Sequence, residues 1–235
     1  MNKIILFLTA CLCFCSCNED YYINKANRYC ELGEFEKAIE CYDKVLELNP
    51  DNYDMYIDKA ITYSDMKKDE EAVKIYSEAI KRFPERAYAY NCRAESYMRL
   101  KEYEKALEDY NSTLKIIVGN GNELFRLAGG VYNEFFHINN PDDNIDPYTV
   151  YADRAVAYYY LDSIKPAWIG VNYCISNSIY ISNSRCLAEC YFWRAFIFLR
   201  INDTRSACDD LKKAASLGLS EAVDEYKRFC DCENN

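Results

Sequence analysis

The chain has 235 residues, with 28 lysine and arginine residues against 38 aspartate and glutamate residues and a formal net charge of −10. It contains only 7 glycines and 5 prolines, too few for an all-β protein with many turns. The acidic balance and the lack of a basic cluster argue against a nucleic-acid partner, because phosphate binding needs clustered lysine and arginine. The length fits one elongated domain.

The first residues predict a segment outside the fold. Lys3 precedes an uncharged apolar run over residues 4–14, which has the charged start and apolar core of a secretory signal and is too short to span a membrane. Residues 14–17, Phe-Cys-Ser-Cys, resemble a bacterial lipobox. The resemblance implies a signal peptide over residues 1–16 and a lipid on Cys17. The alternatives are cleavage near Ser16 without a lipid, or an uncleaved anchor.

The residues after Cys17 bear on localisation. Several acyl chains on Cys17 would anchor the protein stably, because one chain alone holds a protein only marginally. The acidic Glu19 and Asp20 resemble a surface-export signal of some Gram-negative lipoproteins, and an aspartate there also resembles an inner-membrane retention signal. We expect an outer-membrane lipoprotein of the cell envelope, facing the periplasm or the surface. The alternative is that these acidic residues are no sorting signal and only keep the start of the chain solvated.

Beyond this segment the sequence repeats itself every 34 residues. Five columns keep this spacing over three repeats: Tyr22, Tyr56 and Tyr90; Ala26, Ala60 and Ala94; Tyr29, Tyr63 and Tyr97; Ala38, Ala72 and Ala106; and Tyr42, Tyr76 and Tyr110. A fixed period of this length predicts a stacked solenoid. Large aromatic residues at i and i+7 and a small alanine at i+4 lie on the same face of a helix. The small alanine lets a paired helix approach closely.

Turn residues divide each repeat into two helices. In the first repeat Gly33 predicts a turn, because glycine adopts backbone conformations that a Cβ would strain. Pro50 then ends the second helix, since proline cannot continue it.

This pattern resembles the tetratricopeptide repeat. The resemblance covers three repeats over residues 17–120 and returns in degenerate form over residues 148–221. It implies an all-α, right-handed α-solenoid of about five helix-turn-helix repeats. Residues 222–235 are expected to form a capping helix and tail, because the last apolar face has no neighbour. Ser220 is the expected cap, followed by an apolar stripe of Ala222, Val223, Tyr226 and Phe229.

One region interrupts the repeats. Apolar residues at helical spacing, broken by two glycines and followed by a polar loop, predict a helical insertion over residues 121–147. The sequence favours neither of two interpretations of this insertion: a functional role or a purely structural connection.

The resemblance also implies a concave face, lined mainly by the first helix of each repeat, that binds a partner. The register places these residues on the face: Ile23, Asn27, Ile57, Ile61, Asn91, Glu95, Met98, Val156, Tyr159, Phe192 and Phe196. The face is mixed in its first half and aromatic in its second, and aromatic residues are good anchors for peptides or helices. The alternative is that several apolar members pack between repeats.

The best-known peptide clamp of this family uses lysine, asparagine and arginine to hold a C-terminal carboxylate. At the matching positions this chain has Ile23, Asn27, Asp58, Asn91 and Glu95. Acids replace bases, which disfavours a chaperone C-terminus as the ligand.

Nine cysteines follow Cys17, without a CxxC motif. We expect them to be small buried helix residues. A disulfide from Cys186 or Cys190 to Cys230 or Cys232, or a thiolate site made by these four, is the alternative. We predict no metal and no cofactor.

Catalytic signals are weak. The single histidine, His137, lies beside no nucleophile motif, and the chain contains no phosphate loop, HExxH or GxSxG. We therefore predict no enzyme. The favoured function is a lipid-anchored scaffold or adaptor that binds a protein or peptide, and the alternative is a glycan-related accessory lipoprotein that stacks aromatic side chains on sugars.

Overall fold

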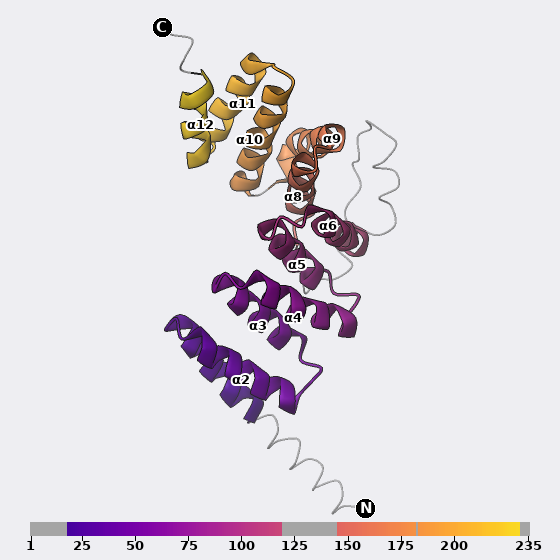
Figure 1. The fold of residues 1–235 in the computed structure, drawn as a ribbon, viewed down its shortest axis with the longest axis vertical. Coiled ribbons are helices and arrows are strands. Elements are labelled where there is room, and N and C mark those ends of the chain that lie inside the picture. Colours follow the sequence, from indigo (N-terminus) through magenta and orange to yellow (C-terminus); the bar gives the residue numbers. More distant parts are fainter. Residues whose placement is uncertain (1–17, 119–144, 182, 231–235) are drawn as a thin grey trace, which may run out of the picture. The chain divides into compact units, whose positions relative to one another are not determined.

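The computed structural model describes residues 18–118, 145–181 and 183–230, and the regular elements within these ranges are all helical (Figure 1). The chain divides into two compact units, Met1–Leu100 and Lys101–Asn235, which are described separately. The predicted signal peptide, the lipidation site Cys17, His137, Cys232 and most of the predicted insertion lie outside the described residues.

The first unit is a series of helices joined by short turns. In chain order they cover residues 18–31, α2 (Phe35–Leu48), α3 (Tyr53–Asp65), α4 (Asp69–Arg82) and α5 (Ala87–Arg99). Within this series α2 packs on α3, α3 on α4, and α4 on α5. Helices α3 and α5, the first helices of two successive repeats, also touch each other directly.

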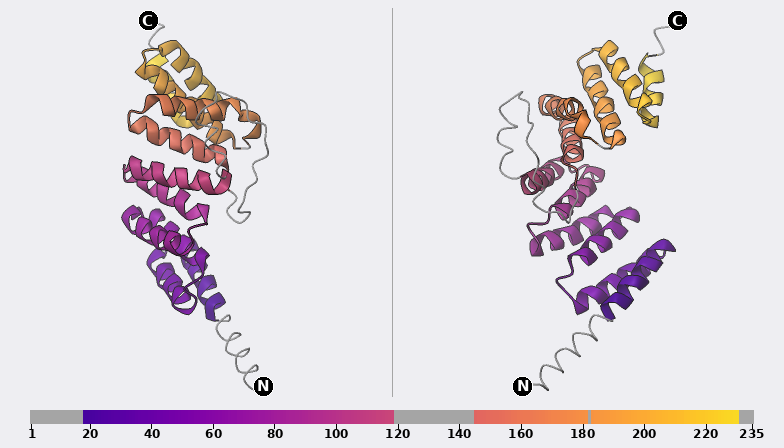
Figure 2. Two further views of the ribbon diagram at one scale, coloured as in Figure 1. Left: turned by 90° about the vertical axis from the view of Figure 1, so that its right-hand side faces the viewer. Right: turned by 180° about the vertical axis from the view of Figure 1, so that it is seen from behind.

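The second unit continues the same alternation. Its elements are α6 (Tyr103–Val118), α8 (Pro147–Tyr160), α9 (Ile164–Ser176), the short 3-10 turn η2 (Ser178–Tyr180), α10 (Ser184–Arg200), α11 (Thr204–Ser216) and α12 (Ser220–Cys230). Helix α8 packs on α6 and α9, and α10 packs on α9 and α11. The right-hand view of Figure 2 shows α11 lying between α10 and α12.

Small residues lie where helices approach most closely. Ala26, Ala38, Ala60 and Ala72 are all fully buried, as expected for positions that let two helices approach. Gly170 extends this rule in the second unit. A Cβ added to Gly170 on α9 would come within 2.7 Å of the Ala155 Cβ on α8, so these two backbones pack more closely than any larger residue would allow.

The turn inside each helix pair contains one residue with a left-handed backbone. These residues are Gly33 (φ 71°), Lys67 (φ 60°), Lys101 (φ 62°), Asp162 (φ 57°) and Asn202 (φ 61°). In four of these turns the amide that follows reaches the carbonyl five residues back, as in Glu34 to Tyr29, which is the Schellman arrangement of helix ends. The turn is therefore set by helix-end hydrogen bonding, and glycine is present in only one of the five.

A second repeated feature joins each repeat to the one before it. A basic side chain on a first helix donates to a polar side chain on the preceding second helix, at equivalent register each time. The bonds are Lys59 to Asp43 (2.5 Å), Arg93 to Ser77 (2.8 Å), Arg154 to Asn111 (2.8 Å) and Arg194 to Asn172 (2.8 Å). Because these donors are charged, each bond is among the stronger ones in the molecule.

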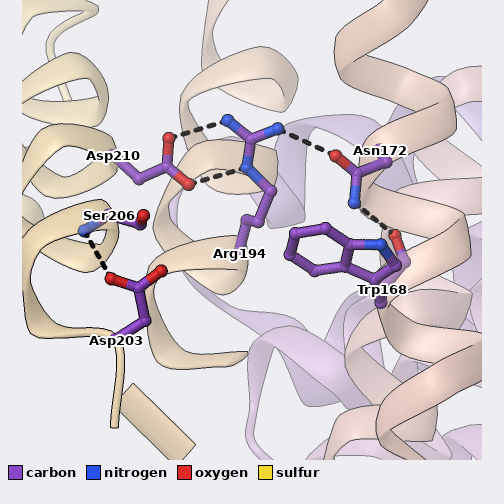
Figure 3. Close-up of polar contacts among 6 residues, drawn as sticks. All are labelled: Trp168, Asn172, Arg194, Asp203, Ser206 and Asp210. Carbon is purple, nitrogen blue, oxygen red and sulfur yellow. Dashed lines mark hydrogen bonds and ion pairs between the residues drawn. The ribbon is translucent and has the colours of Figure 1, made fainter. Parts of the chain in front are cut away.

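The last of these bonds belongs to a network that ties three helices together (Figure 3). The Arg194 guanidinium on α10 donates to both carboxylate oxygens of Asp210 on α11, at 2.7 and 2.8 Å. Its remaining nitrogen reaches Asn172 on α9, whose own amide donates to the Trp168 carbonyl at 2.9 Å. The hydrogen bonds to Asp210 raise the pKa of Arg194. Asp203 separately accepts from the Ser206 amide at 3.1 Å and caps α11.

Two details expected of the C-terminal helix are wrong. Ser220 is the first residue of α12, and its hydroxyl donates to Glu221 at 2.9 Å instead of capping the helix. Val223 is 40% exposed. The contact with the preceding pair is made by Ala222 and Tyr226, because the narrow buried stripe recurs every fourth residue.

A disulfide joins Cys208 on α11 to Cys230 on α12. The alternative pairing of Cys230 with Cys186 or Cys190 is wrong, because Cys230 is bonded to Cys208 and the other two cysteines are free. Cys186 and Cys190 are buried free thiols, and Cys190 lies against Cys174 of α9. Their burial matches the expectation of small core residues.

Candidate functional site

The predicted binding residues of the first unit divide into core and surface. Ile57 is only 4% exposed and packs into the core, so its expected place on a binding face is wrong. It lies on the side of α3 that neighbouring helices cover. Ile23 and Ile61 are half-buried and also pack against core residues. Asn27 and Glu95 are exposed. The accessible part of this face is therefore polar.

A cluster of polar side chains occupies the first helices α3 and α5. We define this polar cluster as Asp58, Tyr88, Asn91 and Glu95. The Asn91 amide nitrogen donates to Glu95 Oε1 at 2.9 Å. Tyr88 has its pKa raised to about 12, first by Cys92 and by burial, and then by the charges of Glu95 and Asp58. The charges of both carboxylates therefore act on this phenol.

The equivalent helices of the second unit carry aromatic side chains. We define the aromatic cluster as six rings in mutual contact: Tyr103, Tyr159, Tyr160, Phe192, Trp193 and Phe196. Tyr103 stacks on Tyr160 with centroids 4.8 Å apart, and Trp193 contacts Tyr160 at 5.5 Å. None of the six is buried, and Tyr160 is 48% exposed.

Three members of the aromatic cluster were predicted and three were missed. Tyr159, Phe192 and Phe196 lie together as the register suggests. Trp193 is half-buried, packs against core residues of α8 and α9, and touches four other rings of the cluster. Tyr103 and Tyr160 join through packing between α6 and α8, which residue spacing does not reveal.

The remaining predicted residues, Met98 and Val156, are half-buried.

Charged groups border the aromatic cluster on one side. The Arg200 guanidinium lies over the Tyr159 ring, 5.0 Å from its centroid, and forms an ion pair with Asp162. Burial raises the pKa of Tyr160, and Tyr103 and Tyr159 add to this effect. An apolar surface with a polar border is typical of a protein interaction site.

Within the described ranges, no group of three or more histidine, cysteine, aspartate or glutamate side chains has the geometry of a metal site. In the same ranges, no helix combines the length and the apolar character needed to cross a membrane.

Comparison with protein families matches residues 19–52 and residues 57–117 to the tetratricopeptide repeat. The predicted repeats in these segments are thereby confirmed. No curated protein matches the chain.

Solved structures share the fold at low sequence identity. MamA 41-end from Desulfovibrio magneticus RS-1 is 13% identical with a TM-score of 0.64, over 85% of this chain and 94% of that one. Pseudomonas aeruginosa pilF is 14% identical with a TM-score of 0.60, over 87% and 78%. YrrB, described as a TPR protein with an unusual peptide-binding site, is 16% identical with a TM-score of 0.60, over 88% and 90%. The predicted all-α solenoid of tetratricopeptide type is confirmed.

Proposed function

We propose that this solenoid of tetratricopeptide type is a lipid-anchored adaptor of the bacterial cell envelope that binds a peptide or helix of a partner protein. The fold itself points to a protein-interaction scaffold. The observation that carries the proposal is the aromatic cluster, because six incompletely buried rings on neighbouring helices leave apolar surface open to a partner. Aromatic anchors of this kind dominate the binding energy of protein interfaces.

Two observations support the proposed location. Tyr22 and Ala26 of the first repeat follow Cys17 within ten residues, so a lipid on Cys17 would hold this repeat close to an outer-membrane surface. The disulfide between Cys208 and Cys230 suits an oxidising compartment outside the cytoplasm, because disulfides rarely persist in reducing cytosol.

A crosslinking pulldown from intact cells tests the proposal. We expect the wild type to enrich a defined envelope protein, and Phe192→Glu/Phe196→Glu to lose it because two charges would enter the aromatic cluster. Ile179→Glu is the matched control, since Ile179 is 83% exposed and lies outside the cluster. Cys17→Ala should release the protein from the membrane fraction. Equal enrichment by the double variant and the wild type would overturn the proposed site.

Sugar binding is the second candidate, because aromatic rings also stack on sugars. The geometry favours it less. Around Trp193 and Phe196 the rings meet at interplanar angles between 45° and 83°, so they present edges to one another and form no flat platform. Calorimetric titration with peptidoglycan fragments would favour the sugar function if it showed binding that Trp193→Ala abolished.

A further inference from the structure

The helix over residues 18–31 exposes a face that the corresponding helices of later repeats bury. Tyr21 on this face is 56% exposed. The equivalent residue is buried in all four later repeats: Met55, Ala89, Val150 and Cys190. Arg28 is exposed as well, whereas its equivalents are buried: Thr62, Ser96, Ala157 and Ile197. In the later repeats this side of the helix packs on the preceding repeat, so the first repeat leaves the same side open.

Lys25 occupies the column of cations that join each repeat to the one before it. The equivalent cations each donate to the preceding second helix: Lys59, Arg93, Arg154 and Arg194. Among the described residues no helix precedes the one over residues 18–31, and Lys25 forms no ion pair with any of them. Its ammonium lies instead 5.6 Å from the ring centroid of Tyr21 and 5.8 Å from that of Tyr29. A cation that joins repeats elsewhere is therefore free to meet another partner here.

The exposed residues of this face form a stripe along the helix. With 3.6 residues per turn, Lys25 and Arg28 lie within about 40° of Tyr21 around the helix axis. The Leu32 amide donates to the Arg28 carbonyl at 3.2 Å, which continues the stripe by one turn, and Leu32 is 62% exposed. We define the outer stripe as Tyr21, Lys25, Arg28 and Leu32. It combines two cations with an aromatic and an aliphatic side chain.

The acidic residues of this helix lie away from the outer stripe. Glu19 Oε1 accepts from the side-chain amides of Asn49 at 3.1 Å and Asn52 at 2.6 Å, at the turn between α2 and α3. Asp20 and Glu31 lie about 80–100° from Tyr21 around the helix axis. Although the whole chain has a net charge of −10, the outer stripe is therefore the cationic side of this helix.

We propose that the outer stripe lies against the phosphate headgroups of the membrane that holds the lipid anchor, an inference that rests on the lipid-anchored function proposed above. Tyr21 follows Cys17 by four residues, so the anchor keeps the stripe within reach of the bilayer surface. Lysine and arginine attract anionic headgroups, and a lipid chain with basic residues holds a protein more firmly than a lipid chain alone. Tyr21 and Leu32 bury apolar surface at the membrane boundary, where tyrosine is enriched.

A second copy of the chain is the alternative occupant, because repeats stack on one another. The observations favour the membrane. A copy that stacked as the repeats do would bury Arg28 at a position where later repeats have small or apolar residues, and an unpaired buried charge is costly. Headgroups instead offer Arg28 and Lys25 a negative charge at a hydrated surface.

Tryptophan quenching in vesicles tests the proposal with the full-length lipoprotein. Leu32→Trp adds an indole to the outer stripe, and its emission is the difference from the wild type, which contains Trp168 and Trp193. The vesicles contain equal parts of phosphatidylglycerol and phosphatidylcholine, with acyl chains either plain or brominated near the headgroup. We expect brominated lipid to quench about half of the added emission or more, because the indole lies at the membrane boundary.

Ile201→Trp is the matched control, since Ile201 occupies the equivalent turn after α10 and is 60% exposed. Its added emission should be the same in plain and brominated vesicles. Equal quenching at the two positions, or quenching at neither, would overturn the proposal. If Leu32→Trp fails to fold, Tyr21→Trp reports from the same stripe.

A second set of variants tests the cations. In the Leu32→Trp background, Lys25→Gln/Arg28→Gln should weaken membrane contact about fivefold for each cation removed and abolish most of the quenching. Lys74→Gln/Lys81→Gln removes the same charge from exposed positions on α4 and should leave the quenching unchanged. Equal loss in the two double variants would indicate general electrostatic attraction and overturn the proposal. Dimerisation in detergent that only Lys25→Gln/Arg28→Gln abolishes would assign the stripe to a second copy and also overturn it.

Mass spectrometry of the purified protein separates the failures of the two proposals. Acyl chains on Cys17 without quenching of Leu32→Trp would remove only the membrane contact and leave the lipid-anchored adaptor. A Cys17 without acyl chains would remove the anchor and the membrane contact with it. Quenching in an acylated protein that captures no partner would leave the membrane contact and remove the adaptor function.

Discussion

Helix α5 in the first unit and helix α10 in the second share one framework and differ on one face. Tyr90 and Ala94 of α5 correspond to Tyr191 and Ala195 of α10, and both alanines are fully buried. The residues that follow these two columns differ. Asn91 and Glu95 of α5 occupy the positions that Phe192 and Phe196 occupy in α10.

This difference separates two kinds of position in the repeat. Framework columns must keep their size, because helices stack against them. The face column that holds Ile57, Asn91 and Phe192 accepts apolar, polar and aromatic side chains in the same fold. We infer that framework substitutions will alter stability, whereas face substitutions will alter binding.

The largest expected effect is on the framework of the second unit. Asp210→Ala leaves the Arg194 guanidinium, held between α9 and α11, without its carboxylate. Removing one partner of such a buried pair costs about 3–5 kcal/mol. Asp69→Ala in the first unit should cost less, because its partner Arg99 is 41% exposed. Urea denaturation of both variants measures the difference, and equal losses would contradict it.

Next is the link between the last two helices. Cys230→Ser opens a disulfide that spans 22 residues, and the expected loss is about 2–4 kcal/mol. The first unit has no disulfide among its described residues, so reducing agent should lower the stability of α12 while leaving protection in α3 and α4 unchanged. Hydrogen exchange measured with and without reductant checks this expectation.

A smaller effect is expected in the turns. Lys67 has a left-handed backbone at the position where the preceding repeat has Gly33. Lys67→Gly relieves the Cβ strain and should raise the free energy of unfolding by about 0.5–1 kcal/mol, net of the entropy that glycine loses on folding. Gly33→Ala should lower it by a similar amount, since φ alone strains that site and no atom lies within 4 Å of the added Cβ. Thermal melts of the two variants should shift in opposite directions.

The smallest effect concerns the face of α5. Because desolvation raises the pKa of Glu95, the folded state binds its proton more tightly than the unfolded state. This contribution to stability is complete at low pH and is lost as pH rises through the folded-state pKa. Glu95→Gln should therefore raise the Tm slightly at pH 7, and the difference should vanish near pH 4. A Tm that falls at pH 7 would show that Glu95 supports the framework.

Much of the helical framework was predictable from residues alone. The 34-residue columns of alanine and tyrosine place the helices, because stacking demands the same sizes at the same register in every repeat. The bonds from Lys59 and Arg93 to the preceding repeat obey this register too. The sequence alone does not predict these bonds, because a basic residue on a helix is equally consistent with a solvent-exposed side chain.

The binding face was less predictable. Register says which side of a helix a residue occupies, but neighbouring helices decide how much of that side remains open. Ile57 is covered by the core, whereas Trp193 is left half-exposed among other rings. The two residues lie one register position apart, so spacing alone could not separate them.

By itself the sequence determined the repeat period, the helix pairs and the buried columns, because these depend on residue size and on spacing along one helix. Tertiary structure alone decided that Cys208 pairs with Cys230, that Tyr103 stacks on Tyr160, and that Asn91 Oδ1 is buried without a donor. Each of these depends on the distance and orientation between side chains, which packing of whole helices sets and local periodicity does not encode.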